Sequence, residues 1–135
     1  MSFHLAFTKF HRYDSSLDGI QIKAVLRSGA VTVDCDAKLD TGAAGCLFAR
    51  ELGESLGLDI ESGYRRNFGT LTGSFVAFGH EVVLETLGLA FDTMVYFPQE
   101  YDIRRNLLGR QGWLQLVQLG LIDYDSEIYL SRLWE

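Results

Sequence analysis

Lys38-Leu39-Asp40-Thr41-Gly42-Ala43-Ala44 is the stretch that decides the fold of this chain. An acidic residue stands at the end of an apolar, alternating run, and a Thr-Gly pair follows it at once. A carboxylate in this position leaves a sheet at a tight turn, where glycine lets other backbone approach closely. Chance supplies an Asp-Thr-Gly tripeptide in about a few percent of chains of this length. The rest of the sequence therefore has to support it.

Two alternating runs precede this motif. Residues 19–26 and 31–39 each alternate between apolar and polar side chains, as half-buried strands do, and residues 27–30 between them carry a turn signal. The pair predicts a β-hairpin whose second strand delivers Asp40 to its end. The residues of that strand expected on one face are Val31, Val33, Cys35, Ala37 and Leu39.

The residues after Asp40 predict a short helix and a glycine-rich hairpin. Large apolar residues recur every four positions from 48 to 56, which indicates an amphipathic helix. Residues 65–79 are rich in glycine, threonine and aromatic residues, a composition typical of a twisted, mobile hairpin. Two apolar strands are expected next, over residues 81–86 and 89–97.

The last third holds a second distinctive motif, Asn106-Leu107-Leu108-Gly109-Arg110, which starts as a short apolar strand and ends in glycine. Residues 111–119 carry apolar residues at helical spacing, which predicts a second short helix with Trp113 and Leu114 in the core. Residues 121–124 and 127–130 are two further strand-like runs. The chain is therefore predicted to be mostly β, with two short helices.

Length and composition fit one globular domain over residues 1–135. Of these residues 47% are hydrophobic, and one is proline. The net charge of −6, without blocks of like charge, makes nucleic acid a poor candidate partner. Residues 1–18 are expected to form an N-terminal extension or edge strand, and the alternation over residues 3–7 suggests a short strand that pairs with a partner chain.

Neither the cysteines nor the histidines form a disulfide or metal pattern. Cys35 and Cys46 are expected to be reduced residues that pack in the protein. His4, His11 and His80 share no ligand spacing, so no metal or other cofactor is expected. No apolar run approaches the roughly 20 residues that span a bilayer, and no signal-peptide pattern is present. A cytoplasmic protein without membrane contact is the expectation.

The order of these motifs resembles the retropepsin-like aspartic proteases, the retroviral proteases and their single-lobed cellular and bacterial relatives. Residues 39–43 and 106–110 carry the resemblance, about 65 residues apart, and it covers roughly residues 19–131. It implies a mostly β, single-lobe acid-protease barrel that works as a homodimer. It also implies a hydrolase: an aspartic endopeptidase that acts on polypeptides without a cofactor.

That resemblance assigns roles to the first motif. An aspartic protease needs two carboxyl groups on one water molecule, and this chain has one Asp-Thr-Gly. The resemblance implies that two chains each donate one Asp40, the catalytic acid and base, across a two-fold axis. Thr41 would hydrogen-bond across that axis, and Gly42 would let the substrate backbone come close.

The resemblance also places the substrate between two segments. Ala43 and Ala44 lie beside the catalytic residues. Opposite them, the hairpin would form a flap that closes over an extended peptide and hydrogen-bonds its backbone. The flap residues expected to bind substrate are Gly69, Thr70, Leu71, Thr72 and Gly73.

Three positions depart from the family pattern. Ala44 stands where retroviral members commonly carry an acid, which pairs with the arginine that follows the glycine of the second motif. Without that acid, Arg110 would either hold the dimer or cap the loop. Asn106 is expected to give further support to the site. Gln111 stands where Asn or Asp is usual. Ala43 lacks a hydroxyl that would stabilise the ionised carboxylate, which favours activity closer to neutral pH.

A second function stays open at this point. A peptide-binding or dimerisation module could keep the same fold without cleaving its ligand, since fold does not fix function. The intact Asp-Thr-Gly favours the enzyme, whereas the missing acid at Ala44 favours the binding module.

Overall fold

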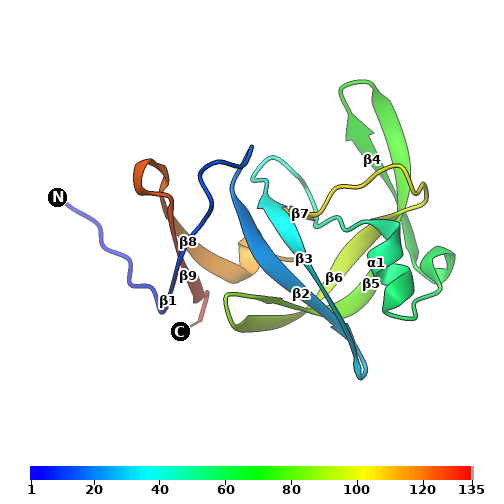
Figure 1. The fold of residues 1–135 in the computed structure, drawn as a ribbon, viewed down its shortest axis with the longest axis horizontal. Coiled ribbons are helices and arrows are strands. Elements are labelled where there is room, and N and C mark those ends of the chain that lie inside the picture. Colours follow the sequence, from blue (N-terminus) through cyan, green and yellow to red (C-terminus); the bar gives the residue numbers. More distant parts are fainter. Residues whose placement is uncertain (135) are drawn as a thin grey trace.

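Residues 1–134, which the computed structural model describes, fold into two sheets and one short α-helix (Figure 1). The strands are β1 (Lys9–Arg12), β2 (Gln21–Ser28), β3 (Val31–Leu39), β4 (Tyr64–Thr70), β5 (Gly73–Thr86), β6 (Leu89–Pro98), β7 (Leu107–Leu108), β8 (Val117–Ile122) and β9 (Glu127–Arg132). The larger sheet has the order β4-β5-β2-β3-β7, with β6 also paired to β5, and the smaller has the order β1-β9-β8. The helix is α1 (Arg50–Ser55), and the 3-10 turns are η1 (Ile60–Ser62), η2 (Leu114–Leu116) and η3 (Asp123–Asp125).

The predicted hairpin before Asp40 is confirmed as β2 and β3. Its two strands pair antiparallel along their whole length, from Gln21 opposite Lys38 to Ser28 opposite Val31. The inward residues of β2 are almost fully buried, whereas the polar residues of β3 stay exposed. Alternation with period two therefore sets the register, because a slip by one residue would expose the whole apolar face.

A single long strand, β5, joins the projecting hairpin to the body of the protein. Its first half pairs with β4, its second half pairs with β2, and β6 runs beside it from Ala77 to Thr86. The predicted strand over residues 81–86 is thus the end of a longer one. In Figure 1 the β4–β5 hairpin extends away from the rest of the molecule.

The first predicted helix is present but short. Helix α1 covers six residues, while Phe48 and Leu56 on either side of it are buried in the core. Gly53 lies in its middle because a Cβ there would come within 2.6 Å of the Ile60 side chain and 2.9 Å of the Phe97 ring. No helix in the described part of the chain is long and apolar enough to cross a membrane.

The second predicted helix, over residues 111–119, is wrong. Gly112 has a φ of +97°, which interrupts any helix there, and only the one turn of η2 follows. From Val117 onward the backbone belongs to β8 and pairs with β9. Trp113 is nevertheless fully buried, so its expected place in the core is confirmed.

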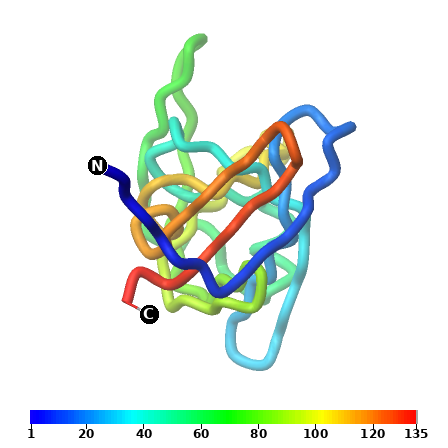
Figure 2. Tube along the Cα trace, turned by 90° about the vertical axis from the view of Figure 1, so that its left-hand side faces the viewer, coloured from blue at the N-terminus to red at the C-terminus, as the bar shows by residue number. Residues whose placement is uncertain are grey.

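Residues 3–7 form no strand within the single chain, so the predicted strand that pairs with a partner chain stays a prediction. The N-terminal strand lies further on, as β1, at the edge of the smaller sheet beside β9 (Figure 2). The segment after β1 is bound to the turn between β8 and β9, because the Tyr13 hydroxyl donates a hydrogen bond to Asp123. Burial is the main cause that raises the pKa of Tyr13 to about 12.

One buried hydrogen bond in the core offers a test of the fold. Trp113 Nε1 donates to Thr86 Oγ1 at 2.9 Å, where both side chains are inaccessible to solvent. Thr86→Val keeps the shape but leaves the indole N–H without a partner, which is expected to lower the free energy of unfolding by about 1–3 kcal/mol. Urea denaturation measures the change. Thr86→Ser keeps the acceptor, so a loss in Thr86→Ser as large as that in Thr86→Val would contradict this account.

Candidate active site

The loop that carries Asp40 begins where β3 meets β7. These strands pair in parallel, with Lys38 opposite Leu107 and Leu39 opposite Leu108. The pairing continues one step further, because the Asp40 backbone N–H donates to the Leu108 carbonyl at 3.0 Å. The two sequence motifs are therefore adjacent in space, and the second fixes the position of the first.

The same loop returns along the other side of β7. Leu47 and Leu107 exchange two backbone hydrogen bonds, at 2.7 and 3.1 Å. The Arg110 N–H donates to the Ala43 carbonyl at 2.9 Å, and the Gln111 N–H donates to the Ala44 carbonyl at 2.8 Å. β7 is thus enclosed between β3 and residues 43–47, which leaves the Asp40 loop little freedom.

Gly109 makes this enclosure possible. A Cβ at Gly109 would lie 2.1 Å from the Gly45 carbonyl oxygen and 2.9 Å from that of Ala43. Real Cβ atoms do not approach backbone oxygens that closely, so only glycine fits here. The glycine of the second motif is therefore a packing requirement of the first.

The Asp40 carboxylate is half-buried and turns back over its own loop. Its Oδ1 accepts a hydrogen bond from the Gly42 N–H at 2.9 Å. Thr41 and Gly42 are exposed, and a Cβ on Gly42 would come within 3.3 Å of the same Oδ1. A backbone N–H thus orients the carboxylate, while the residues beside it remain open to contact.

A cleft of about 820 Å³ opens above Asp40. The Asp40 loop forms its floor, the β4–β5 hairpin one wall, and the end of the segment between β6 and β7 the other. The lining residues from the floor are Asp40, Gly42, Ala43, Ala44, Gly45 and Leu47; from the hairpin, Arg66 through Phe75; from the segment between β6 and β7, Ile103 and Arg105; and from β7 itself, Leu107.

Aromatic rings support the foot of the hairpin. Phe68 and Phe75, which lie opposite each other in the β4–β5 pairing, stack with their centroids 5.6 Å apart. Phe68 also meets Tyr96 of β6 edge-on at 5.2 Å. The tip differs, since Leu71 is fully exposed. The hairpin is therefore anchored at its foot and bare at its end.

Most of the residues predicted for the site come together in this cleft. They are Asp40, Gly42, Ala43, Ala44, Gly69, Thr70, Leu71, Thr72 and Gly73. Thr41, Asn106 and Arg110 do not line it. Asn106 braces the loop from behind, because its Oδ1 accepts from the Ala49 N–H at 3.0 Å. The Arg110 side chain is exposed, so within one chain it is the Arg110 backbone N–H that caps the loop.

Several lining residues were not predicted from the sequence, among them Leu47, Arg66, Asn67, Ile103, Arg105 and Leu107. The motif containing Leu107 was found, but its side chain was not assigned to the cleft. Arg65 and Arg66 are adjacent in a strand, so one of the two had to face the cleft. Only the register of β4 on β5 decides which one does.

The two cysteines of the chain offer no alternative nucleophile. Cys46 is buried beside the loop, and burial raises the pKa of its thiol to about 11; burial likewise raises that of Cys35 to about 12. Neither thiol is therefore poised as a thiolate. Among residues 1–134, no three His, Cys, Asp or Glu side chains cluster to hold a metal ion.

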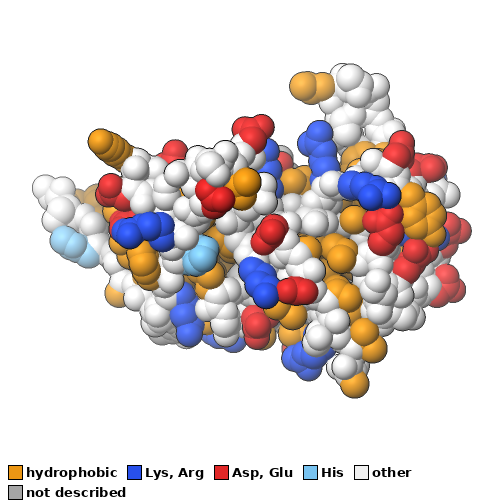
Figure 3. All heavy atoms as spheres, in the orientation of Figure 1, with side chains coloured by type: hydrophobic (Ala, Val, Ile, Leu, Met, Phe, Trp, Pro, Cys, Tyr) orange, Lys and Arg blue, Asp and Glu red, His pale blue; other side chains and the backbone are white. Residues whose placement is uncertain are grey.

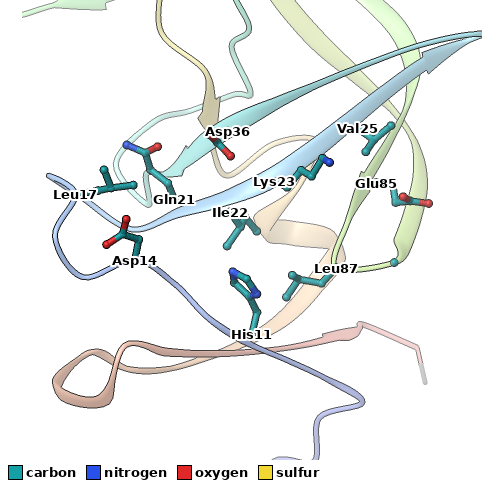
Figure 4. A pocket seen from close by; sticks show the side chains of 11 residues that line it. His11, Asp14, Leu17, Gln21, Ile22, Lys23, Val25, Asp36, Glu85 and Leu87 are labelled. Atoms are coloured by element: carbon teal, nitrogen blue, oxygen red, sulfur yellow. The ribbon is translucent and has the colours of Figure 1, made fainter.

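A second hollow of about 560 Å³ lies between β2 and the segment around β1 (Figure 4). His11, Ile22 and Leu87 point toward it, and charged groups of both signs surround it, including Lys23 and Asp36. None of these side chains belongs to either of the two sequence motifs. The Asp40 cleft, which joins both motifs and the hairpin, is therefore the candidate active site.

Two solved structures similar to this chain are proteases. A retropepsin-like aspartic protease from Rickettsia conorii superposes with a TM-score of 0.67 and 20% identity, covering 95% of this chain and 100% of that one. EIAV protease complexed with the inhibitor HBY-793 gives a TM-score of 0.54 and 19% identity, covering 69% of this chain and 83% of that one. No family model and no curated protein sequence matches the chain. The chain thus has the single-lobe fold of the retropepsin-like aspartic proteases.

Proposed function

We propose that this chain is an aspartic endopeptidase that acts as a homodimer, with one Asp40 from each subunit. The observation that carries the proposal is the position of Asp40, on the floor of a cleft beneath a projecting hairpin, in a loop fixed on both sides of β7. Asp40 is the only acidic residue among the described residues that line the cleft. The second carboxylate therefore comes from a second chain.

The proposed reaction needs both carboxyl groups on one water molecule. Two carboxyl groups that both contact one water molecule share one proton, so one group is ionised and the other is protonated. The ionised group takes a proton from the water as it attacks the peptide carbonyl, while the protonated group hydrogen-bonds the carbonyl oxygen. Collapse of the tetrahedral intermediate then transfers a proton to the leaving amine. No cofactor enters the reaction.

The residues around Asp40 take supporting roles in this proposal. Thr41, which is exposed beside the carboxylate, hydrogen-bonds the partner's loop across the two-fold axis. Gly42, Ala43 and Ala44 offer a floor without bulky side chains, on which an extended substrate can lie. The flap, residues 69–73, closes over the substrate and pairs with its backbone as an added strand.

The dimer contact is proposed to extend beyond the active site. Phe3 and Leu5 are 88% and 67% exposed, and apolar side chains in such positions favour a partner surface. Arg110, whose side chain is exposed and whose backbone N–H donates to the Ala43 carbonyl, is a second candidate contact. Residues 1–135 would form one domain of this dimer.

The alternative is a peptide-binding or dimerisation module that uses the same cleft without cleavage. The observation that favours it is Ala44, which leaves the cleft floor without a second acid in each chain. Binding would then rest on strand pairing with the hairpin. The product distinguishes the two functions, since only the enzyme releases new peptide termini.

The test is an assay of an unstructured peptide library over a range of protein concentrations. For a dimeric enzyme, new termini appear and the activity per chain falls once dilution separates the subunits. Mass spectrometry of the products and solution mass of the protein give both readouts. Bound but intact peptides would favour the binding module, and cleavage by a strictly monomeric protein would refute the shared site.

A further inference from the structure

The charges that line the cleft differ from those of the whole chain. The chain carries a net charge of −6, yet the charged lining residues among those described are Asp40, Arg66 and Arg105. On the face shown in Figure 3, Lys and Arg side chains lie at the foot of the projecting hairpin. The cleft is thus a locally positive site in an acidic protein.

Arg105 is exposed, and no ion pair or hydrogen bond of residues 1–134 occupies its guanidinium. Its neighbour Arg104 differs, since it pairs with Glu51 at 3.3 Å and lies outside the cleft lining. Two contacts hold the segment that carries both: Arg50 donates to the Gln99 carbonyl, and Asn106 binds the Ala49 N–H. The backbone therefore presents Arg105 to the cleft and directs Arg104 away from it.

Arg66 adds a second positive charge, and no carboxylate of residues 1–134 pairs with its guanidinium. Its guanidinium lies over the rings of Phe68 and Tyr96, at 4.7 and 5.3 Å from their centroids. It also donates to Gln111 Oε1 at 3.0 Å, which is a neutral acceptor. Stacking and this bond hold the cation in place without cancelling its charge.

We propose that the cleft selects polypeptide segments with an acidic side chain, Asp or Glu, which pairs with Arg105 in the positive field of both arginines. This inference rests on the proposed function and names the substrate class of the same site. A guanidinium binds a carboxylate through two parallel hydrogen bonds, and a walled cleft concentrates the field of its charges. A lysine in the same position of the substrate would be repelled.

The test uses sets of three fluorogenic peptides that differ only in having Glu, Gln or Lys at one position. Each set varies a different position of the peptide. At one position the Glu peptide is expected to have a kcat/KM at least about tenfold above the Gln peptide, which corresponds to about 1.4 kcal/mol. The Lys peptide is expected to be the poorest. The preference should weaken as salt is added, because salt screens partly exposed charges.

Each arginine of the cleft has a matched control next to it in the sequence. Arg105→Gln is expected to abolish the preference and Arg105→Glu to reverse it toward Lys, whereas Arg104→Gln keeps it. Arg66→Gln should reduce the preference, whereas Arg65→Gln, outside the cleft lining, should not. Equal rates for the three peptides at every position, or equal effects of Arg104→Gln and Arg105→Gln, would overturn the proposal.

A binding measurement separates this proposal from the proposed cleavage. The same three peptides, labelled with a fluorophore, are titrated with Asp40→Asn protein and followed by anisotropy. Tighter binding of the Glu peptide, without cleavage of any peptide by the wild type, would support the acidic preference and refute the endopeptidase. Cleavage without any Glu preference would refute the acidic preference alone.

Discussion

Asp40→Asn is expected to lower kcat by at least about a thousandfold, which corresponds to about 4 kcal/mol of transition-state stabilisation. An amide cannot take a proton from water, so the proposed pair of Asp40 carboxyl groups loses its base. The fold should not change, because asparagine retains an oxygen that can accept the Gly42 N–H as Asp40 Oδ1 does. Steady-state kinetics on any cleaved peptide, together with a denaturation curve, gives both quantities.

Asp36→Asn is the matched control for this variant. Asp36 lies in β3, the strand that Asp40 directly follows. Its side chain is exposed, and it lines the second hollow instead of the cleft. Its rate is expected to remain close to that of the wild type. Comparable losses in the two variants would mean that net charge, and not the Asp40 carboxylate, controls the activity.

A mixture of wild type and Asp40→Asn extends the same prediction to the dimer. If each active site takes one carboxylate from each chain, mixed dimers are inactive. An equal mixture, after exchange of subunits, should then retain about one quarter of the activity of an all-wild-type sample of the same total concentration. A value of one half would show that each chain works alone, and the shared site would be wrong.

Gly109→Ala is expected to have the largest effect on stability. The added methyl group meets the Gly45 carbonyl oxygen at 2.1 Å, and backbone hydrogen bonds hold the facing segment on β7. Because that segment cannot move without losing these bonds, the free energy of unfolding should fall by about 3 kcal/mol or more. Chemical denaturation followed by tryptophan fluorescence measures the change.

Gly69→Ala is the control for this second variant. A Cβ at Gly69 meets no atom within 4 Å, and its φ lies outside the left-handed region. Its free energy of unfolding should therefore change by no more than about 0.5 kcal/mol. If Gly109→Ala were equally mild, the enclosure of β7 would not be the contact that fixes the Asp40 loop.

The sequence predicts best where one face of a strand is buried. The alternation of residues 19–26 and 31–39 locates the hairpin, because each apolar position has to meet the core. Prediction from the sequence fails at residues 111–119, where the spacing of the apolar residues fits a helix as well as it fits a strand. There the backbone at Gly112 and the pairing of β8 with β9 override the local pattern.

Some residues of the candidate site could likewise be predicted from the sequence, and others could not. Asp40 and the β4–β5 hairpin could be found from the sequence, since a tight turn and a flexible hairpin need particular residue types. Arg66 and Arg105 could not, because nothing local distinguishes them from Arg65 and Arg104. Strand register and the path of a connecting segment decide which arginine of each pair faces the cleft.

The long strand β5 has a consequence for movement. β6 accompanies it only as far as Ala77, where it ends at Pro98, and the last bond on that side joins the Gln99 N–H to the Val76 carbonyl. Beyond this point the hairpin is a ribbon of two strands, which holds its shape less firmly than a wider sheet. We therefore expect the tip to bend about a point near Val76 more readily than the Asp40 loop beneath it moves.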